Sequence, residues 1–225
     1  MIPEHGVILD AGTGIFRARD LIQTPTLQIF LTHTHLDHVV GLTYLLDVLY
    51  QKSLKSVTVY VDPTKRAAIE NHLFDEQIFP VRPVFEFADL GTEAIALPGQ
   101  GKLTPFPLHH PGGCLGFRLD WPQTSLAYVT DTTADLKADY VQRIKGVNTL
   151  IHECYLADGF EEHAKLTGHS CLTPVAQVAQ ASGAKKTYLV HLSPLEESDS
   201  FLDLNSVSSI CSKMEIPEDG QVVNI

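Results

Sequence analysis

Near the start of this sequence, a run of potential metal ligands directly follows an apolar strand. This arrangement limits both the fold that the chain can adopt and the function that it can have. The strand is predicted over residues 27–31, and the run after it is His33-Thr34-His35-Leu36-Asp37-His38. On an extended backbone alternate side chains point the same way, so His33, His35 and Asp37 share one face. Burying such a polar group is costly unless a cation neutralises and orients it. The run therefore predicts a metal site at the carboxyl end of a strand.

Short β-like runs alternate with helical stretches along the whole chain, and the middle third is rich in strands. Strands are predicted over residues 7–9, 27–31, 57–61, 84–87, 94–97, 103–108, 115–119, 125–129, 147–151 and 187–190. Helices are predicted over residues 39–50, 63–74, 174–181 and 205–213. A β-rich middle with mixed flanks fits an α/β fold in which sheets pack between helical layers. We expect one domain over residues 1–225.

Length and composition indicate a globular cytoplasmic protein. The chain has 225 residues, enough for a substantial core, and its 44% hydrophobic content argues against disorder. No apolar run approaches the roughly 20 residues that span a bilayer, and the first residues do not resemble a signal peptide. The four cysteines form no CxxC pair. We therefore expect no membrane segment, no disulfide framework and a reducing compartment.

The net charge of −11 argues against binding nucleic acid through bulk electrostatics. Two divalent ions would add roughly four positive charges locally, so a small anionic substrate can still be attracted to the metal site. Imidazole and carboxylate ligands suit zinc, with manganese and iron(II) as alternatives.

The histidine run also carries a resemblance to a known family. Residues 33–42, HTHLDHVVGL, resemble the HxHxDHxxGL signature of the metallo-β-lactamase superfamily, and the resemblance covers nearly the whole chain. Other matching motifs are residues 9–14, LDAGTG, residues 109–118, HHPGGCLGFR, residues 128–132, YVTDT, and residues 189–194, LVHLSP. The HHPGG motif is similar to the phosphodiesterase branch, which includes ribonuclease Z and a cyclic phosphodiesterase of phosphonate metabolism.

The resemblance implies an αββα sandwich, here with shortened N-terminal strands, and a site for two metal ions. One metal would lie on His33, His35 and His110. The second would lie on Asp37, His38 and His191, and Asp131 would bridge the two. Asp10 would support the metal loop without binding metal. The implied nucleophile is a hydroxide that bridges the metals and is oriented by Asp37.

Two positions near this implied site keep alternatives open. His109 competes with His110, although His110 has the family's spacing to the following strand. His169, in Gly168-His169-Ser170, resembles a histidine that lies near the scissile phosphate and can protonate the leaving oxygen. The alternative is that His169 only caps the helix near residue 174. Glu153 is a candidate to orient His169, and His152 can be a satisfied interior residue.

Departures from the family pattern bear on the substrate. The chain begins almost at the LDAGTG motif, so either its start is late or a second subunit, as in a homodimer, covers the sheet edge. Only 20 residues separate His110 from Asp131, which leaves no room for the arm that grips tRNA in bacterial ribonuclease Z. Imidazole at His35 indicates hydrolysis, because oxygen-reducing diiron relatives carry a carboxylate there.

The leading hypothesis is a dinuclear metal-dependent phosphodiesterase that acts on a small, even cyclic, phosphodiester. A lactonase or thioester hydrolase on the same metal site is the alternative enzyme. A non-catalytic, metal-stabilised binding domain is the alternative outside the enzymes.

Overall fold

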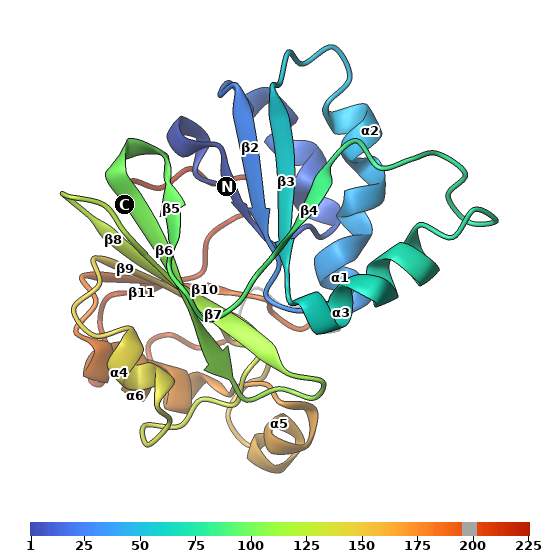
Figure 1. The fold of residues 1–225 in the computed structure, drawn as a ribbon. Coiled ribbons are helices and arrows are strands. Elements are labelled where there is room, and N and C mark those ends of the chain that lie inside the picture. The colour runs from blue at the N-terminus through green and yellow to red at the C-terminus, as the bar shows by residue number, and fades with distance from the viewer. Residues whose placement is uncertain (195–201) are drawn as a thin grey trace. The chain divides into compact units, whose positions relative to one another are not determined.

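A computed structural model describes residues 1–194 and 202–225 of the chain. The chain divides into two compact units, which are residues Met1–Gly99 and Gln100–Ile225. Each unit is an α/β arrangement with its own sheet and its own hydrophobic core (Figure 1). Within the described residues, no helix is both long and apolar enough to cross a bilayer.

The first unit contains a four-stranded parallel sheet in the order β1-β2-β3-β4. The strands are β1 (Val7–Leu9), β2 (Thr26–Phe30), β3 (Ser56–Val61) and β4 (Glu86–Asp89). Its helical segments are η1 (Pro3–His5), η2 (Thr13–Leu21), α1 (Leu36–Val39), η3 (Val40–Tyr44), α2 (Leu45–Val48), α3 (Pro63–Ala68) and η4 (Ile69–Leu73). The short β5 (Ile95–Leu97) and η5 (Pro98–Gln100) come at its end.

The predicted helix over residues 39–50 is divided into three short pieces, and Gly41 shows why. Its backbone N–H donates to the carbonyl of Ala11, 2.7 Å away, rather than to a carbonyl of its own helix. A Cβ at Gly41 would lie 2.2 Å from the carbonyl oxygen of Gly12. The chain therefore packs backbone against backbone here, which only glycine permits, and the helical hydrogen bonding is interrupted.

The second unit contains β6 to β11 in the order β11-β10-β9-β8-β7-β6. The strands are β6 (Gly101–Leu108), β7 (Cys114–Asp120), β8 (Ser125–Val129), β9 (Thr149–Glu153), β10 (Lys186–Val190) and β11 (Met214–Glu215). The helices are α4 (Tyr140–Arg143), α5 (Glu161–Thr167) and α6 (Leu172–Ser182). Strands β6, β7 and β8 pair antiparallel, whereas β8, β9, β10 and β11 pair parallel.

The predicted helix over residues 205–213 is wrong, because most of this segment forms successive turns. The Asp203 carboxylate accepts from the backbone N–H of Asn205, and the Ser206 hydroxyl donates to the carbonyl of Asp203. Short polar side chains that bond the nearby backbone compete with helical hydrogen bonding. These local polar contacts therefore favour turns over the predicted helix.

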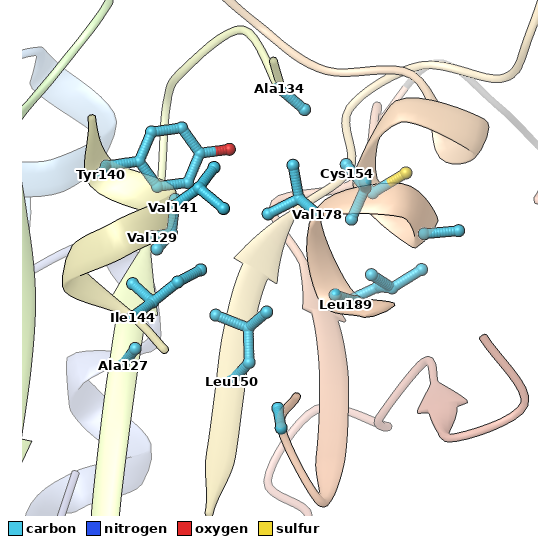
Figure 2. Close-up of a cluster of buried hydrophobic side chains, with 14 of the residues drawn as sticks. Ala127, Val129, Ala134, Tyr140, Val141, Ile144, Leu150, Cys154, Val178 and Leu189 are labelled. Atoms are coloured by element: carbon cyan, nitrogen blue, oxygen red, sulfur yellow. The ribbon is translucent and has the colours of Figure 1, made fainter. Parts of the chain in front are cut away.

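The core of the second unit fixes the strands that carry its polar residues. Figure 2 shows Val129 on β8, Leu150 on β9 and Leu189 on β10 beneath the side chains of α4 and α6. Each of these three residues is at most 1% exposed. Full burial of a side chain of this size stabilises the fold by roughly 1.5–3 kcal/mol. The carboxyl ends of β8, β9 and β10 are therefore held rigidly side by side.

Candidate metal centre

The first unit gathers four potential ligands, His33, His35, Asp37 and His38, which we call the first ligand cluster. The ring centroids of His33 and His35 are 4.4 Å apart, and those of His33 and His38 are 4.2 Å apart. The Nε2 atom of His38 lies 3.3 Å from Oδ2 of Asp37. His33 and His38 are buried, whereas His35 and Asp37 are exposed. The cluster thus presents imidazole and carboxylate groups at the end of β2.

Asp10 supports this cluster from beneath, as the sequence predicts. One carboxylate oxygen accepts from the backbone N–H of Thr32 at 2.8 Å, and the other accepts from Nδ1 of His38 at 3.0 Å. The Thr32 hydroxyl also donates to Asp10, so it accepts from Nδ1 of His33. Protons on Nδ1 leave the lone pairs of His33 and His38 on Nε2, which is the tautomer that binds a metal.

The second unit gathers His110, Asp131 and His191, which we call the second ligand cluster. Asp131 is 2% exposed and directs its two oxygens toward two different imidazoles. Its Oδ2 lies 3.7 Å from Nε2 of His110, and its Oδ1 lies 3.4 Å from Nε2 of His191. The Thr130 hydroxyl donates to Oδ1 at 2.6 Å. A carboxylate with one oxygen toward each histidine has the form of a bridging ligand.

Three residues of these clusters and their support have left-handed backbone conformations. The φ angles are +56° at Asp10, +35° at Asp131 and +53° at His191. All three follow a buried strand, and residues with side chains adopt this conformation at a cost. The conformation turns each side chain out of its strand direction, so the packed strand supports a strained backbone at the position where the polar group is needed.

The structure distinguishes His110 from His109. His110 is buried, and its Nδ1 donates to the carbonyl of Gly168 at 3.0 Å while Nε2 faces Asp131. His109 is exposed, and its backbone N–H donates to the Thr132 hydroxyl. This geometry gives His110 the ring orientation of a ligand and leaves His109 at the surface.

Glu153 and His169 form a hydrogen-bonded pair in the second unit, as expected for these residues. Glu153 is 0% exposed, and its carboxylate accepts from Nδ1 of His169 at 3.2 Å. It also accepts from the backbone N–H groups of Thr132, Tyr155 and Ser170. His169 does not cap α6, because α6 has Cys171 at its N-cap and no side-chain cap. His169 instead lies with its ring 5.2 Å from that of His110.

His152 is the satisfied interior residue that the sequence allowed. The Tyr140 hydroxyl donates to its Nε2 at 3.1 Å, and its Nδ1 donates to the carbonyl of Glu153 at 2.7 Å. Burial lowers the pKa of His152, and burial together with the nearby Glu153 charge raises the pKa of Tyr140 well above its ordinary range. Both groups therefore stay uncharged and fix the end of β9.

Tyr155 is a further residue of this region that no sequence feature identifies, and its ring lies beside the polar groups of the second unit. Its centroid is 4.6 Å from that of His169 and 5.6 Å from that of His191. Tyr155 belongs to no motif, and its position two residues after Glu153 carries no signal by itself. Only the turn after β9 places it beside the histidines.

The donors in each cluster fit a divalent ion. His33 and His35 have potential ligand atoms within 4.8 Å of each other, and so do His38 and Asp37 in the same unit. In the second unit the same holds for Asp131 with His110 and for Asp131 with His191. Imidazole and carboxylate groups at such separations suit zinc, manganese or iron(II).

Comparisons with known proteins extend over nearly the whole chain. A family model described as a beta-lactamase superfamily domain matches residues 5–192. A ribonuclease BN from Erwinia tasmaniensis is 26% identical, with 84% of this chain and 81% of the relative covered. The metallo-beta-lactamase fold protein YhfI from Bacillus subtilis superposes with a TM-score of 0.76 at 15% identity, covering 97% and 87% of the two chains. A diphosphatase from the PhnP family superposes with a TM-score of 0.73 at 20% identity, covering 97% and 79%. The fold is therefore the metallo-β-lactamase fold.

Proposed function

Because the chain belongs to the metallo-β-lactamase superfamily of hydrolases, we propose that it is a phosphodiesterase that uses two divalent metal ions and acts on a small phosphodiester, cyclic esters included. The observation that carries this proposal is the hydrogen bond between the buried Glu153 and the half-buried His169, whose imidazole lies beside those of His110 and His191. An imidazole held by a carboxylate near metal-binding histidines is suited to protonate a leaving oxygen.

The proposal assigns the metal ligands across the two clusters. His33, His35 and His110 would hold one ion, Asp37, His38 and His191 would hold the other, and Asp131 would be a ligand of both. The support comes from within each unit, where Asp131 directs one oxygen toward each of its two histidines and Asp10 fixes the tautomer of His38. When bound, two divalent ions acidify a water molecule and stabilise charge on the attacking and leaving oxygens. Zinc is the metal we propose, with manganese and iron(II) as alternatives.

The chain's own residues contribute orientation and a proton. Asp37 is an exposed carboxylate next to Nε2 of His38, so it can accept a hydrogen bond from the attacking water and set its direction. To act as an acid, the His169 imidazole must carry a proton on each nitrogen. It donates Nδ1–H to Glu153 and keeps that proton, so the proton on Nε2 is the one that transfers to the leaving oxygen. An alkoxide leaves poorly without that proton, which is why the acid matters for ordinary phosphodiesters.

The segment between His110 and Asp131 supports the proposal of a small substrate. Strands β7 and β8 occupy most of it, and a tight turn joins them, with Trp121 N–H donating to the carbonyl of Thr124. This segment provides no extended arm for a large RNA. The net charge of −11 also disfavours tRNA. We therefore propose a small anionic substrate, although a relative carries the name ribonuclease BN.

The proposed compartment is the cytoplasm, because all four cysteines are free and three of them are buried. Buried free thiols are typical of proteins from a reducing environment. A homodimer stays a prediction, and its test is the molar mass in solution.

The test is a substrate panel on the purified protein loaded with zinc or with manganese. The panel contains bis(p-nitrophenyl) phosphate, a 2′,3′-cyclic nucleotide, a precursor tRNA, several lactones and a thioester. We expect turnover of the two small phosphodiesters, and slower or no turnover of the others. Hydrolysis of a lactone or thioester without phosphodiester turnover would overturn the proposal in favour of carbonyl chemistry. Metal binding without any turnover would favour a binding domain.

A further inference from the structure

We propose that Tyr155 is a positioning residue that holds the imidazole of His169 in the orientation for proton transfer to the leaving oxygen. This inference rests on the proposed function, because it concerns the same reaction. Tyr155 does not donate or accept the transferred proton. It acts through its ring, which lies against the face of His169.

The ring contacts of Tyr155 are specific. Its centroid is 4.6 Å from that of His169 with an interplanar angle of 23°, which is a stacked arrangement. His191 lies 5.4 Å from His169 at 22°, and 5.6 Å from Tyr155. Stacked rings at such distances attract each other in addition to burying apolar area. The three rings lie close together. His169 therefore has the ring of Tyr155 on its face and the carboxylate of Glu153 at its edge.

Tyr155 is itself anchored on two sides. Its backbone N–H donates to Oε2 of Glu153 at 3.0 Å, the same carboxylate that holds His169 through Oε1. Its side chain packs against a small apolar cluster formed by Leu156, Ala164 and Cys171. Tyr155 is half-buried. These contacts hold its ring in place against the imidazole of His169.

These contacts restrain different motions of His169. The hydrogen bond from Nδ1 to Glu153 fixes the edge of the ring, but it permits rotation about the line that joins the two atoms. A parallel ring on the face of the imidazole opposes that rotation. Together the two contacts determine where Nε2 points, and accurate placement of a general acid is what its contribution to the rate depends on.

The consequence can be measured by changing the leaving group. The acid is needed when the leaving oxygen is a poor leaving group and is dispensable when a stable anion such as p-nitrophenolate departs. Loss of a positioning residue for the acid therefore slows substrates with poor leaving groups selectively. A residue that only supports the fold would slow all substrates by a similar factor.

The experiment compares bis(p-nitrophenyl) phosphate with diphenyl phosphate for wild type, Tyr155→Leu and Tyr155→Phe. For Tyr155→Leu we expect kcat on diphenyl phosphate to fall by about tenfold or more, within the range that general acids contribute. We expect kcat on bis(p-nitrophenyl) phosphate to change by less than about twofold. Tyr155→Phe keeps the stacked ring and should behave as wild type on both substrates. In a His169→Ala background, Tyr155→Leu should have no further effect on diphenyl phosphate.

Tyr140→Phe is the matched control, because Tyr140 is a hydrogen-bonded tyrosine of the same unit that supports His152 instead of His169. Any effect of Tyr140→Phe should be equal for the two substrates. An equal effect of Tyr155→Leu on both substrates, or none on either, overturns the inference.

A second readout does not depend on turnover. In the zinc-loaded protein, NOE spectra should show the His169 ring in one fixed orientation relative to the ring of His191 in wild type. In Tyr155→Leu the NOE signals between His169 and His191 should weaken, because the imidazole can then rotate about its hydrogen bond to Glu153. Unchanged signals overturn the inference. Absence of phosphodiester turnover by wild type, in contrast, overturns the proposed function and leaves the spectra to decide the role of Tyr155.

Discussion

At the residue scale, the contact made by Nδ1 sets the orientation of three of the candidate histidine ligands. Nδ1 of His38 donates to Asp10, Nδ1 of His33 donates to Thr32, and Nδ1 of His110 donates to a backbone carbonyl. Each contact fixes both the tautomer and the plane of the ring. The acceptors differ in kind, so the three histidines respond differently to mutation.

Asp10→Asn should weaken metal binding while the fold is retained. The amide has the size of the carboxylate, but it cannot accept from Thr32 and His38 in the same way, so His38 loses its fixed tautomer. Loss of such a supporting contact typically lowers metal affinity by about 10–100-fold. A competition titration with a fluorescent zinc chelator measures this. The control is Asp62→Asn at the N-cap of α3, which should leave zinc affinity unchanged. Equal affinities for Asp10→Asn and wild type would refute the role of Asp10.

The buried imidazole of His152 should make the free energy of unfolding depend on pH. Burial lowers its pKa from the ordinary value of 6.5, so the unfolded chain binds a proton that the folded chain does not as the pH falls below that value. Stability is therefore lost toward acid, with a slope of up to about 1.4 kcal/mol per pH unit from this group.

The comparison for His152 uses His152→Gln, which keeps an acceptor for Tyr140 and a donor to the carbonyl of Glu153 without titrating. Urea unfolding at several pH values between neutrality and mild acid gives the two slopes. We expect a shallower loss of stability in the variant. Parallel slopes would show that His152 already binds its proton in the folded state.

At the element scale, the polar groups of the second unit follow the ends of strands that lie side by side. Val129 on β8 and Leu189 on β10 both pair with His152 on β9. Asp131 and His191 each come two residues after those positions, and Glu153 follows His152 directly. The register of the sheet therefore places the three acidic and imidazole groups in neighbouring positions.

Gly168 joins the end of α5 to the second ligand cluster, and its substitution tests that connection. Its φ is +74°, and a Cβ there would lie 2.5 Å from Cδ of Pro111 and 2.8 Å from Nδ1 of His110. Gly183 ends α6 with a similar φ of +70° and has nothing within 4 Å. Gly183→Ala should cost roughly 1–2 kcal/mol from backbone strain alone. Gly168→Ala should cost about 1–3 kcal/mol more and also weaken zinc binding, because His110 must move.

Thermal unfolding and zinc titration of the two glycine variants provide the measurement. The prediction concerns the difference between them, since both pay the same backbone penalty. If Gly168→Ala and Gly183→Ala lost the same stability and bound zinc equally well, the close approach of Gly168 to His110 would contribute nothing to stability or to zinc binding.

The sequence could predict the local features of the fold and of the candidate site. The strands after which the ligands come are apolar runs with turn residues behind them, and the ligand spacing is a property of those few residues. The predicted helix over residues 205–213 was wrong because side-chain contacts to the backbone, such as those of Asp203, favour turns there. Tyr155 could not be found, because its role depends on the path of the turn between Glu153 and α5.

At the scale of the whole molecule, charge distinguishes the proposed substrate from a nucleic acid. The chain has 27 acidic and 16 basic residues, so it has no excess of cations with which to hold many phosphates. Raising salt from about 50 to 200 mM should change kcat/KM for a small phosphodiester only modestly, whereas 6–10 phosphate contacts would cost about 10³–10⁵ in affinity. A steep decline of kcat/KM with salt would indicate an extended nucleic-acid substrate.

We propose that the two ligand clusters together bind two metal ions, which is also what would make residues 1–225 one functional domain. Elemental analysis of wild type, His35→Ala and Asp131→Ala after equilibration with zinc measures the metal content of each protein. We expect two metal ions per chain for wild type, fewer for His35→Ala, and the largest loss for Asp131→Ala, because its carboxylate would be shared by both ions. Asp62→Ala, at an exposed helix cap, should retain two. Two ions per chain in both His35→Ala and Asp131→Ala would overturn the proposed metal site.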